Sequence, residues 1–84
     1  MYELRLTRSA RKELEALPPA VLGRVARQLD ALPANPRPRG CKKLRGASDL
    51  WRVRVGDYRI VYHVDDRARL IEVRAIRHRK DAYE

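Results

Sequence analysis

The dipeptide Gly56-Asp57 stands between two runs in which apolar and basic residues alternate, and it constrains the fold more than any other feature of the sequence. Glycine in the first position of a two-residue loop is typical of a type II′ turn, which joins two antiparallel strands. This turn predicts three cross-strand pairs: Val55 with Tyr58, Val53 with Ile60, and Trp51 with Tyr62. All six side chains are apolar or aromatic and point to one face, so that face must be the core side of a sheet.

Arginines occupy the opposite face of the same hairpin. Arg54 falls across from Arg59, and Arg52 falls across from Val61. Like charges that oppose each other directly destabilise a sheet, although the stem of a single arginine can cover apolar surface while its head stays in water. A bound phosphate chain would convert the repulsion into attraction, because guanidinium forks match phosphate oxygens. We therefore interpret this face as an anion-binding surface.

A third strand is predicted for residues 69–76. A turn over residues 65–68 predicts these pairs on the core face: Ile71 with Tyr62, Val73 with Ile60, and Ala75 with Tyr58. On the other face, Arg74 then lies opposite Arg59, and Glu72 is the nearby counter-charge. The arginines expected to gather on this face are Arg52, Arg54, Arg59 and Arg74.

The N-terminal half of the chain predicts one strand and two helices. Residues 2–6 alternate between apolar and charged, which is the period of a half-buried strand. Thr7 or Ser9 can cap a short helix, and a second helix follows Pro18-Pro19. The apolar faces of the two helices carry Ala10, Leu14 and Leu17, and then Leu22, Val25, Ala26, Leu29 and Leu32. We expect one α+β domain over residues 1–84, with the order β-α-α-β-β-β and a helical hairpin packed on one face of an antiparallel-rich sheet.

The chain is strongly basic, with 20 Lys and Arg against 11 Asp and Glu and a net charge of +9. Such an excess points to a polyanionic partner, either nucleic acid or an acidic protein. Cys41 is the only cysteine, which excludes an internal disulfide and fits a reducing compartment. No long apolar run marks a signal peptide or a membrane span, so we expect a cytoplasmic protein with no membrane partner. No cluster of His, Cys and carboxylates has metal-ligand spacing, so we expect neither a metal nor another cofactor.

Three segments resemble the RelE branch of the RelE/ParE toxin superfamily: residues 43–46 (KLRG), 51–62 (WRVRVGDYRIVY) and 76–83 (IRHRKDAY). The resemblance covers nearly the whole chain, including the expected order of strands and helices. It implies the toxin of a type II toxin–antitoxin system, an endoribonuclease that cleaves messenger RNA, in many members at the ribosomal A site, and so inhibits translation. It also implies a cognate antitoxin, which we expect to wrap the toxin with an acidic segment.

The resemblance also implies roles for individual residues. Two basic residues that contact the RNA backbone in the family match Arg52 and Arg54, and an arginine on the next strand matches Arg59. The basic residue after the last strand matches Arg79, and the tyrosine that stacks on a base matches Tyr83. The best-known members carry lysine where Arg52 and Arg54 stand, and arginine stays protonated, so neither residue is expected to act as a general base.

The mechanism expected on this basis is metal-free transesterification, in which a ribose 2′-oxygen attacks the adjacent phosphate. Arg59, with Arg54 or Arg79, would stabilise the charge that builds on the phosphate oxygens. His78 would transfer protons, because an imidazole exchanges protons near neutral pH. The other basic residues expected to bind RNA are Arg52, Lys42, Lys43, Arg45, Arg74 and Arg77.

Two alternatives share the same fold, and a fold alone does not decide between them. One is a ParE-like toxin that inhibits DNA gyrase and has no nuclease activity. The other is an inactive relative that binds RNA in a salt-dependent way without cleaving it.

Overall fold

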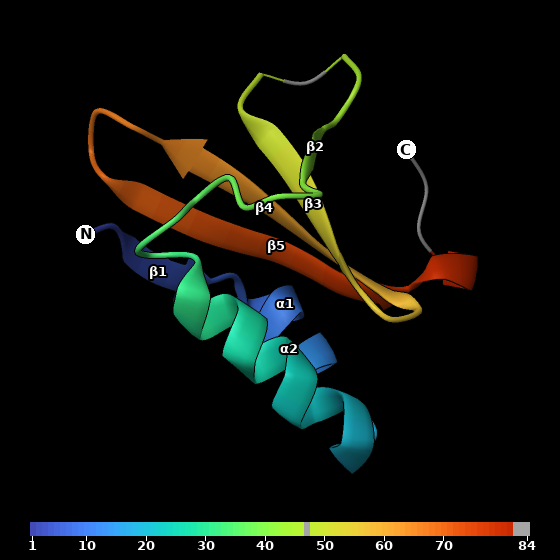
Figure 1. Ribbon diagram of the computed structural model, residues 1–84. Coiled ribbons are helices and arrows are strands. Elements are labelled where there is room, and N and C mark those ends of the chain that lie inside the picture. Colours follow the sequence, from blue (N-terminus) through green and yellow to red (C-terminus); the bar gives the residue numbers. More distant parts are fainter. Residues whose placement is uncertain (47, 82–84) are drawn as a thin grey trace.

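Five strands form one mixed sheet, and both helices lie on the same side of it (Figure 1). The computed structural model describes residues 1–46 and 48–81. Its elements are β1 (Glu3–Leu6), α1 (Arg8–Glu15), α2 (Pro19–Ala31), β2 (Lys42–Lys43), β3 (Leu50–Val55), β4 (Tyr58–Asp65), β5 (Leu70–His78) and a 3-10 helix (Arg79–Asp81). The strand order is β1-β5-β4-β3-β2. The expected α+β class and the placing of the helices on one face are confirmed, and β2 is an addition that the sequence pattern did not predict.

The N-terminal elements follow their local signals. β1 runs parallel to β5, with Leu4 beside Ile71. Of the two expected caps, Thr7 is the one used, since its hydroxyl accepts a hydrogen bond from the backbone N–H of Ala10. The backbone of Pro18 precedes α2, and Pro19 occupies its first turn, where a missing N–H costs nothing.

The core lies between the helices and the sheet face that the β3–β4 hairpin was predicted to bury. The pairs Val55–Tyr58, Val53–Ile60 and Trp51–Tyr62 all occur. Gly56 has a φ of 60°, as the first residue of a type II′ turn requires. From α2 and the residue after it, Val25, Leu29 and Leu32 are buried against this face.

Leu22 departs from the expected apolar face of α2, because its side chain is 37% exposed. In Figure 1 the N-terminal end of α2 points away from the sheet. The spacing of apolar residues fixes which side of a helix faces the core, but not how far the sheet reaches along it.

The predicted β4–β5 register is wrong. The connecting loop spans residues 66–69, not 65–68, because the Asp65 carboxylate accepts the backbone N–H of Ala68 and Arg69 adopts a φ of 56°. Val73 therefore pairs with Tyr62, where the prediction had Ile60.

A β-bulge then changes the register again. The pairing skips one residue of β5 between Val73 and Ala75, so that Ile60 pairs with Ile76. Without this extra residue, Ile76 would point away from the core and Arg77 would point into it, because a one-residue slip moves each side chain to the other face. With the bulge, Ile76 is buried and Ala75, which was expected in the core, is only half-buried. Burial of Ile76 thus explains the position of the bulge.

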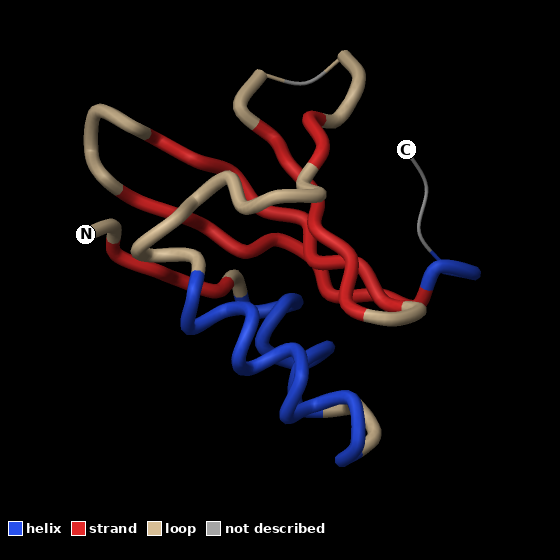
Figure 2. Tube along the Cα trace, viewed as in Figure 1, coloured by secondary structure: helices blue, strands red, loops and turns tan. Residues whose placement is uncertain are grey.

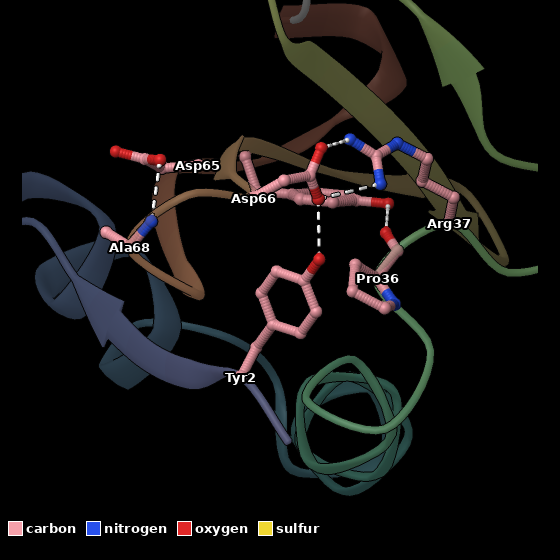
Figure 3. A network of polar contacts seen from close by, with 7 residues as sticks. Tyr2, Pro36, Arg37, Asp65, Asp66 and Ala68 are labelled. Atoms are coloured by element: carbon pink, nitrogen blue, oxygen red, sulfur yellow. Dashed lines mark hydrogen bonds and ion pairs between the residues drawn. The ribbon is translucent and has the colours of Figure 1, made fainter.

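The loop between α2 and β2 runs across the sheet to the edge opposite β1 (Figure 2). Side-chain contacts hold this loop in place. Arg37 makes a two-pronged ion pair with Asp66, with Nη2–Oδ2 and Nη1–Oδ1 distances of 2.8 Å and 3.2 Å. Tyr2 donates its hydroxyl to the same carboxylate at 2.5 Å (Figure 3). The buried Tyr62 hydroxyl donates to the Pro36 carbonyl at 2.7 Å. The hydrogen bonds from Arg37 and Tyr2 lower the pKa of the Asp66 carboxyl, and burial raises the pKa of Tyr62.

Neither helix among the described residues is long and apolar enough to span a membrane.

Candidate nucleic-acid interface

Three arginines lie side by side on the outer face of the sheet, which is the face away from the helices. Arg54 of β3 pairs with Arg59 of β4, and Arg59 pairs in turn with Arg77 of β5. We call Arg54, Arg59 and Arg77 the arginine row. Directly opposite residues on neighbouring strands have Cβ atoms about 5 Å apart, so the three arginine side chains leave the sheet next to one another. The row therefore forms a preorganised site for an anion with several oxygens.

The members of the row differ in exposure and support. Arg54 is exposed and Arg59 is half-buried. Arg77 donates its Nε–H to Glu13 of α1 at 2.9 Å, while the other oxygen of that carboxylate accepts the backbone N–H of Ile76. Glu13 thus orients Arg77. It also pairs the backbone N–H of Ile76, which lies past the last residue of β5 that pairs with β1. Glu13 was not expected in the site, since no local pattern in the sequence links it to a residue 64 positions away.

Arg74 does not belong to the row, contrary to the expectation from sequence. It falls at the bulge of β5 and has no pairing partner on β4. Its Nε donates to Glu72 at 2.9 Å. Glu72, the counter-charge expected near the arginines, is therefore paired with Arg74. Arg77 occupies the position opposite Arg59 because the loop shifts the register by two residues and the bulge shifts it by one more.

Arg52 has the predicted pairing but not the predicted exposure. It pairs with Val61 on one side and with Lys42 of β2 on the other. Only 8% of its surface is accessible, so it is not displayed to solvent as the other basic residues are. Lys42, Lys43 and Arg45 are exposed along the β2 side of the sheet and extend the basic surface away from the row.

His78 lies on the wrong side of the sheet for the role expected of it. It pairs with Tyr58, whose ring it meets edge-on at a centroid distance of 5.2 Å. It lines a shallow pocket with Arg77 and with Ala16 and Leu17, which follow α1 on the helix-covered side. Its Nδ1 accepts the backbone N–H of Lys80. The bulge is again the cause, because it fixes which residues at the end of β5 face the helices.

Arg79 begins the 3-10 helix after β5, beside the β3–β4 turn. Its backbone N–H donates to the Asp57 carbonyl at 2.7 Å, and its Nε is 3.9 Å from the Asp57 carboxylate. This contact joins the C-terminal 3-10 helix to the β3–β4 turn. Tyr83, the expected base-stacking residue, lies outside the described residues.

Two basic residues near the row were missed. Arg24 and Arg27 of α2 line a shallow pocket with Arg54 and Gly56. Their spacing of three residues places them on one face of a helix, which is a sequence signal, but nothing in the sequence shows that this face lies beside Arg54. Within residues 1–46 and 48–81, no group of three His, Cys, Asp or Glu side chains could hold a metal ion.

The chain matches known toxins along nearly its whole length. The family model described as the ParE toxin of the type II toxin-antitoxin system, parDE, matches residues 4–83. The putative toxin RelE1 of Methanocaldococcus jannaschii is 32% identical, over 98% of this chain and 94% of its own length. Toxin RelG of Mycobacterium tuberculosis is 31% identical, over 98% of this chain and 95% of its own length.

The same relationship is seen in three dimensions. RelE in the archaeal RelE–RelB complex from Pyrococcus horikoshii superposes with a TM-score of 0.83 at 32% identity, over 96% of this chain and 98% of that one. The fold and the sequence together define a toxin of the type II toxin–antitoxin class. Within that class the chain belongs to the ParE/RelE toxin family, and the relatives named above are RelE-type toxins.

Proposed function

We propose that this chain is a cytoplasmic endoribonuclease that cleaves messenger RNA at the ribosomal A site and thereby inhibits translation. The observation that carries the proposal is the arginine row, in which Arg54, Arg59 and Arg77 occupy directly paired positions on three strands. Opposed like charges destabilise a sheet, so the arrangement is best explained by an anionic ligand. Family membership supports this reading, because the similar chains are RelE toxins.

The reaction we propose is attack of a ribose 2′-oxygen on the adjacent phosphorus. The 2′-hydroxyl loses its proton, the bond from phosphorus to the 5′-oxygen breaks, and the leaving 5′-oxygen takes up a proton. The products are a 2′,3′-cyclic phosphate and a 5′-hydroxyl. Negative charge builds on the non-bridging oxygens, and Arg54 and Arg59 would stabilise it. Preorganised donors of this kind supply about 3 kcal/mol each.

The remaining basic residues would position the RNA. Arg77, oriented by Glu13, and Arg79, anchored at Asp57, lie at the same end of the sheet as Arg54 and Arg59. Lys42, Lys43 and Arg45 would hold phosphates further along the strand of RNA, and Tyr83 would stack on a base. We assign no proton transfer to His78, since its ring packs edge-on against Tyr58 and lines a pocket with Glu13 of α1 and Arg77.

A cognate antitoxin is the second partner we propose. The solved neighbours include RelE toxins in complex with RelB antitoxins. With a net charge of +9, this chain attracts an acidic segment, and a segment laid over the row would exclude RNA from it.

A gyrase-inhibiting toxin is the alternative function, and one observation favours it. The matching family model carries the description of a ParE toxin, not of a RelE toxin. The row does not by itself distinguish the two, because a fold hosts more than one activity. The distinction has to come from a cleavage assay.

The deciding experiment adds purified protein to ribosomes translating a defined message and maps the cuts by primer extension. We expect cuts within A-site codons from the wild-type chain and from Arg74→Ala, which lies outside the row. Arg59→Ala should cut at least ~10²-fold more slowly, the effect of losing one preorganised donor. Equal cutting by Arg59→Ala would contradict the site. Folded wild-type protein that leaves RNA intact but inhibits supercoiling by gyrase would establish the alternative.

A further inference from the structure

A second basic site lies around the edge of the sheet from the arginine row. It is formed by Arg24, Arg27 and Gln28 of α2 together with Arg54 and Gly56 of the β3–β4 hairpin. We call it the α2 pocket. Arg54 belongs to both the pocket and the row, so the two basic surfaces are continuous.

Gly56 allows a close approach of one arginine head of the α2 pocket. A Cβ added to Gly56 would lie 3.1 Å and 3.2 Å from the two terminal nitrogens of Arg24. The guanidinium therefore rests close to the bare backbone of the turn, and a Cβ at this position would have to displace it slightly. A Cβ added to Gly23 would meet Arg27 at 3.8 Å, which is ordinary contact.

The described part of the chain does not neutralise the charges of the α2 pocket. None of its described lining residues is acidic. Within residues 1–46 and 48–81, Arg24, Arg27 and Arg54 take part in no ion pair or side-chain hydrogen bond. Other arginines do have carboxylate partners: Arg5, Arg37, Arg74 and Arg77. Three uncompensated guanidinium groups around one open pocket raise its positive potential and favour an anion there.

We propose that the α2 pocket binds a backbone phosphate of RNA and continues the phosphate path that begins at the arginine row. This inference rests on the proposed function, since it takes the row as the site of RNA. A phosphate fits better than a carboxylate, because its oxygens can accept hydrogen bonds from more than one guanidinium fork, and the Gln28 amide adds a further donor. The phosphate comes from the message or from ribosomal RNA, and the two sources can be separated by experiment.

The test compares two double variants with equal loss of charge. Arg24→Ala/Arg27→Ala removes the pocket, and Arg8→Ala/Arg11→Ala removes two exposed arginines from α1. Binding of each protein is measured across a salt series with two probes. The first is a single-stranded RNA made uncleavable by 2′-deoxy substitution, and the second is the small ribosomal subunit without message. Urea unfolding of both variants confirms that they are folded.

We expect the pocket variant to bind at least one probe about tenfold more weakly than the α1 variant. Its salt slope should be smaller by ~0.7 for each phosphate of single-stranded RNA that the protein no longer neutralises. Weaker binding to the first probe assigns the pocket to the message, and weaker binding to the second alone assigns it to ribosomal RNA. If wild-type protein cuts message while the two variants bind both probes equally, only the pocket proposal is overturned. Wild-type protein that neither binds nor cuts RNA overturns the proposed function as well.

Discussion

Arg54 and Arg59 lie directly opposite each other across the β3–β4 hairpin, two residues' distance from the Gly56-Asp57 turn on either strand. Both side chains lie on the outer face, so two positively charged residues oppose each other close to the hairpin turn. A protein selected for stability alone would place a carboxylate or a threonine at one of these positions. The pair is therefore the clearest sign that this face is built for a ligand.

Removing one charge of this pair should separate stability from function. We expect Arg54→Gln to raise the free energy of unfolding by roughly 0.5 kcal/mol at low salt, with a smaller gain at high salt, because the repulsion is screened. The same variant should bind RNA more weakly. Urea unfolding at two salt concentrations and an RNA-binding titration check both effects. A loss of stability together with unchanged RNA binding would contradict the assignment of the row.

His78 provides a test of the site's geometry. Because its ring packs against Tyr58 on the helix-covered side, we expect His78→Ala to keep cleavage within about threefold of wild type, whereas loss of a general acid–base catalyst costs ~10²–10⁴-fold. Single-turnover cleavage, measured where both proteins are folded, gives the answer. A loss of a hundredfold or more would show that His78 reaches the RNA after all.

Gly56 of the α2 pocket and Gly23 of α2 should respond differently to alanine. Gly56→Ala forces a side chain onto a φ of 60° and against the Arg24 guanidinium, so we expect a loss of roughly 1–2 kcal/mol in the free energy of unfolding. Gly23→Ala removes a glycine from a helix where a Cβ meets only ordinary contact, and should gain roughly 0.5–1 kcal/mol. Chemical denaturation measures both. Equal effects would contradict the described turn.

Asp66 should make stability depend on acid pH. The hydrogen bonds from Arg37 and Tyr2 hold its pKa in the folded chain below the unfolded value. The resulting stabilisation is complete above the unfolded pKa of ~4 and is lost as the pH falls through the folded pKa. Wild type should thus be more stable than Asp66→Asn by a constant margin between pH 5 and 8, and the margin should shrink below about pH 4. Urea unfolding across this range checks it, and a margin unchanged down to pH 2 would count against the Arg37–Asp66–Tyr2 contact.

Much of the fold follows from short-range patterns. The alternation around Gly56-Asp57 gave the register of β3 and β4, and with it the pairing of Arg54 with Arg59. The sequence also predicted a cap at Thr7 or Ser9 and the start of α2 at the proline pair. These features depend on residues close together in the chain, whose periodicity and backbone preferences act wherever the segment lies.

The rest of the site was decided by contacts between distant segments. The shifted β4–β5 loop and the bulge in β5 together put Arg77 opposite Arg59 in place of Arg74, and the bulge also brings Ile76 into the core and turns His78 toward the helices. A sequence shows alternation on a strand, but a one-residue insertion into the pairing reverses every later side chain, and only packing against the core selects it.

The sequence by itself therefore determined the class of fold, the central hairpin and the basic character of its outer face. Tertiary structure alone decided which arginines complete that face, that Arg52 is buried, and that Arg24 and Arg27 stand beside Arg54. The physical reason is range: periodicity and turn chemistry are properties of neighbours along the chain, whereas burial, strand register beyond a tight turn and the meeting of a helix with a sheet edge are set by the whole core.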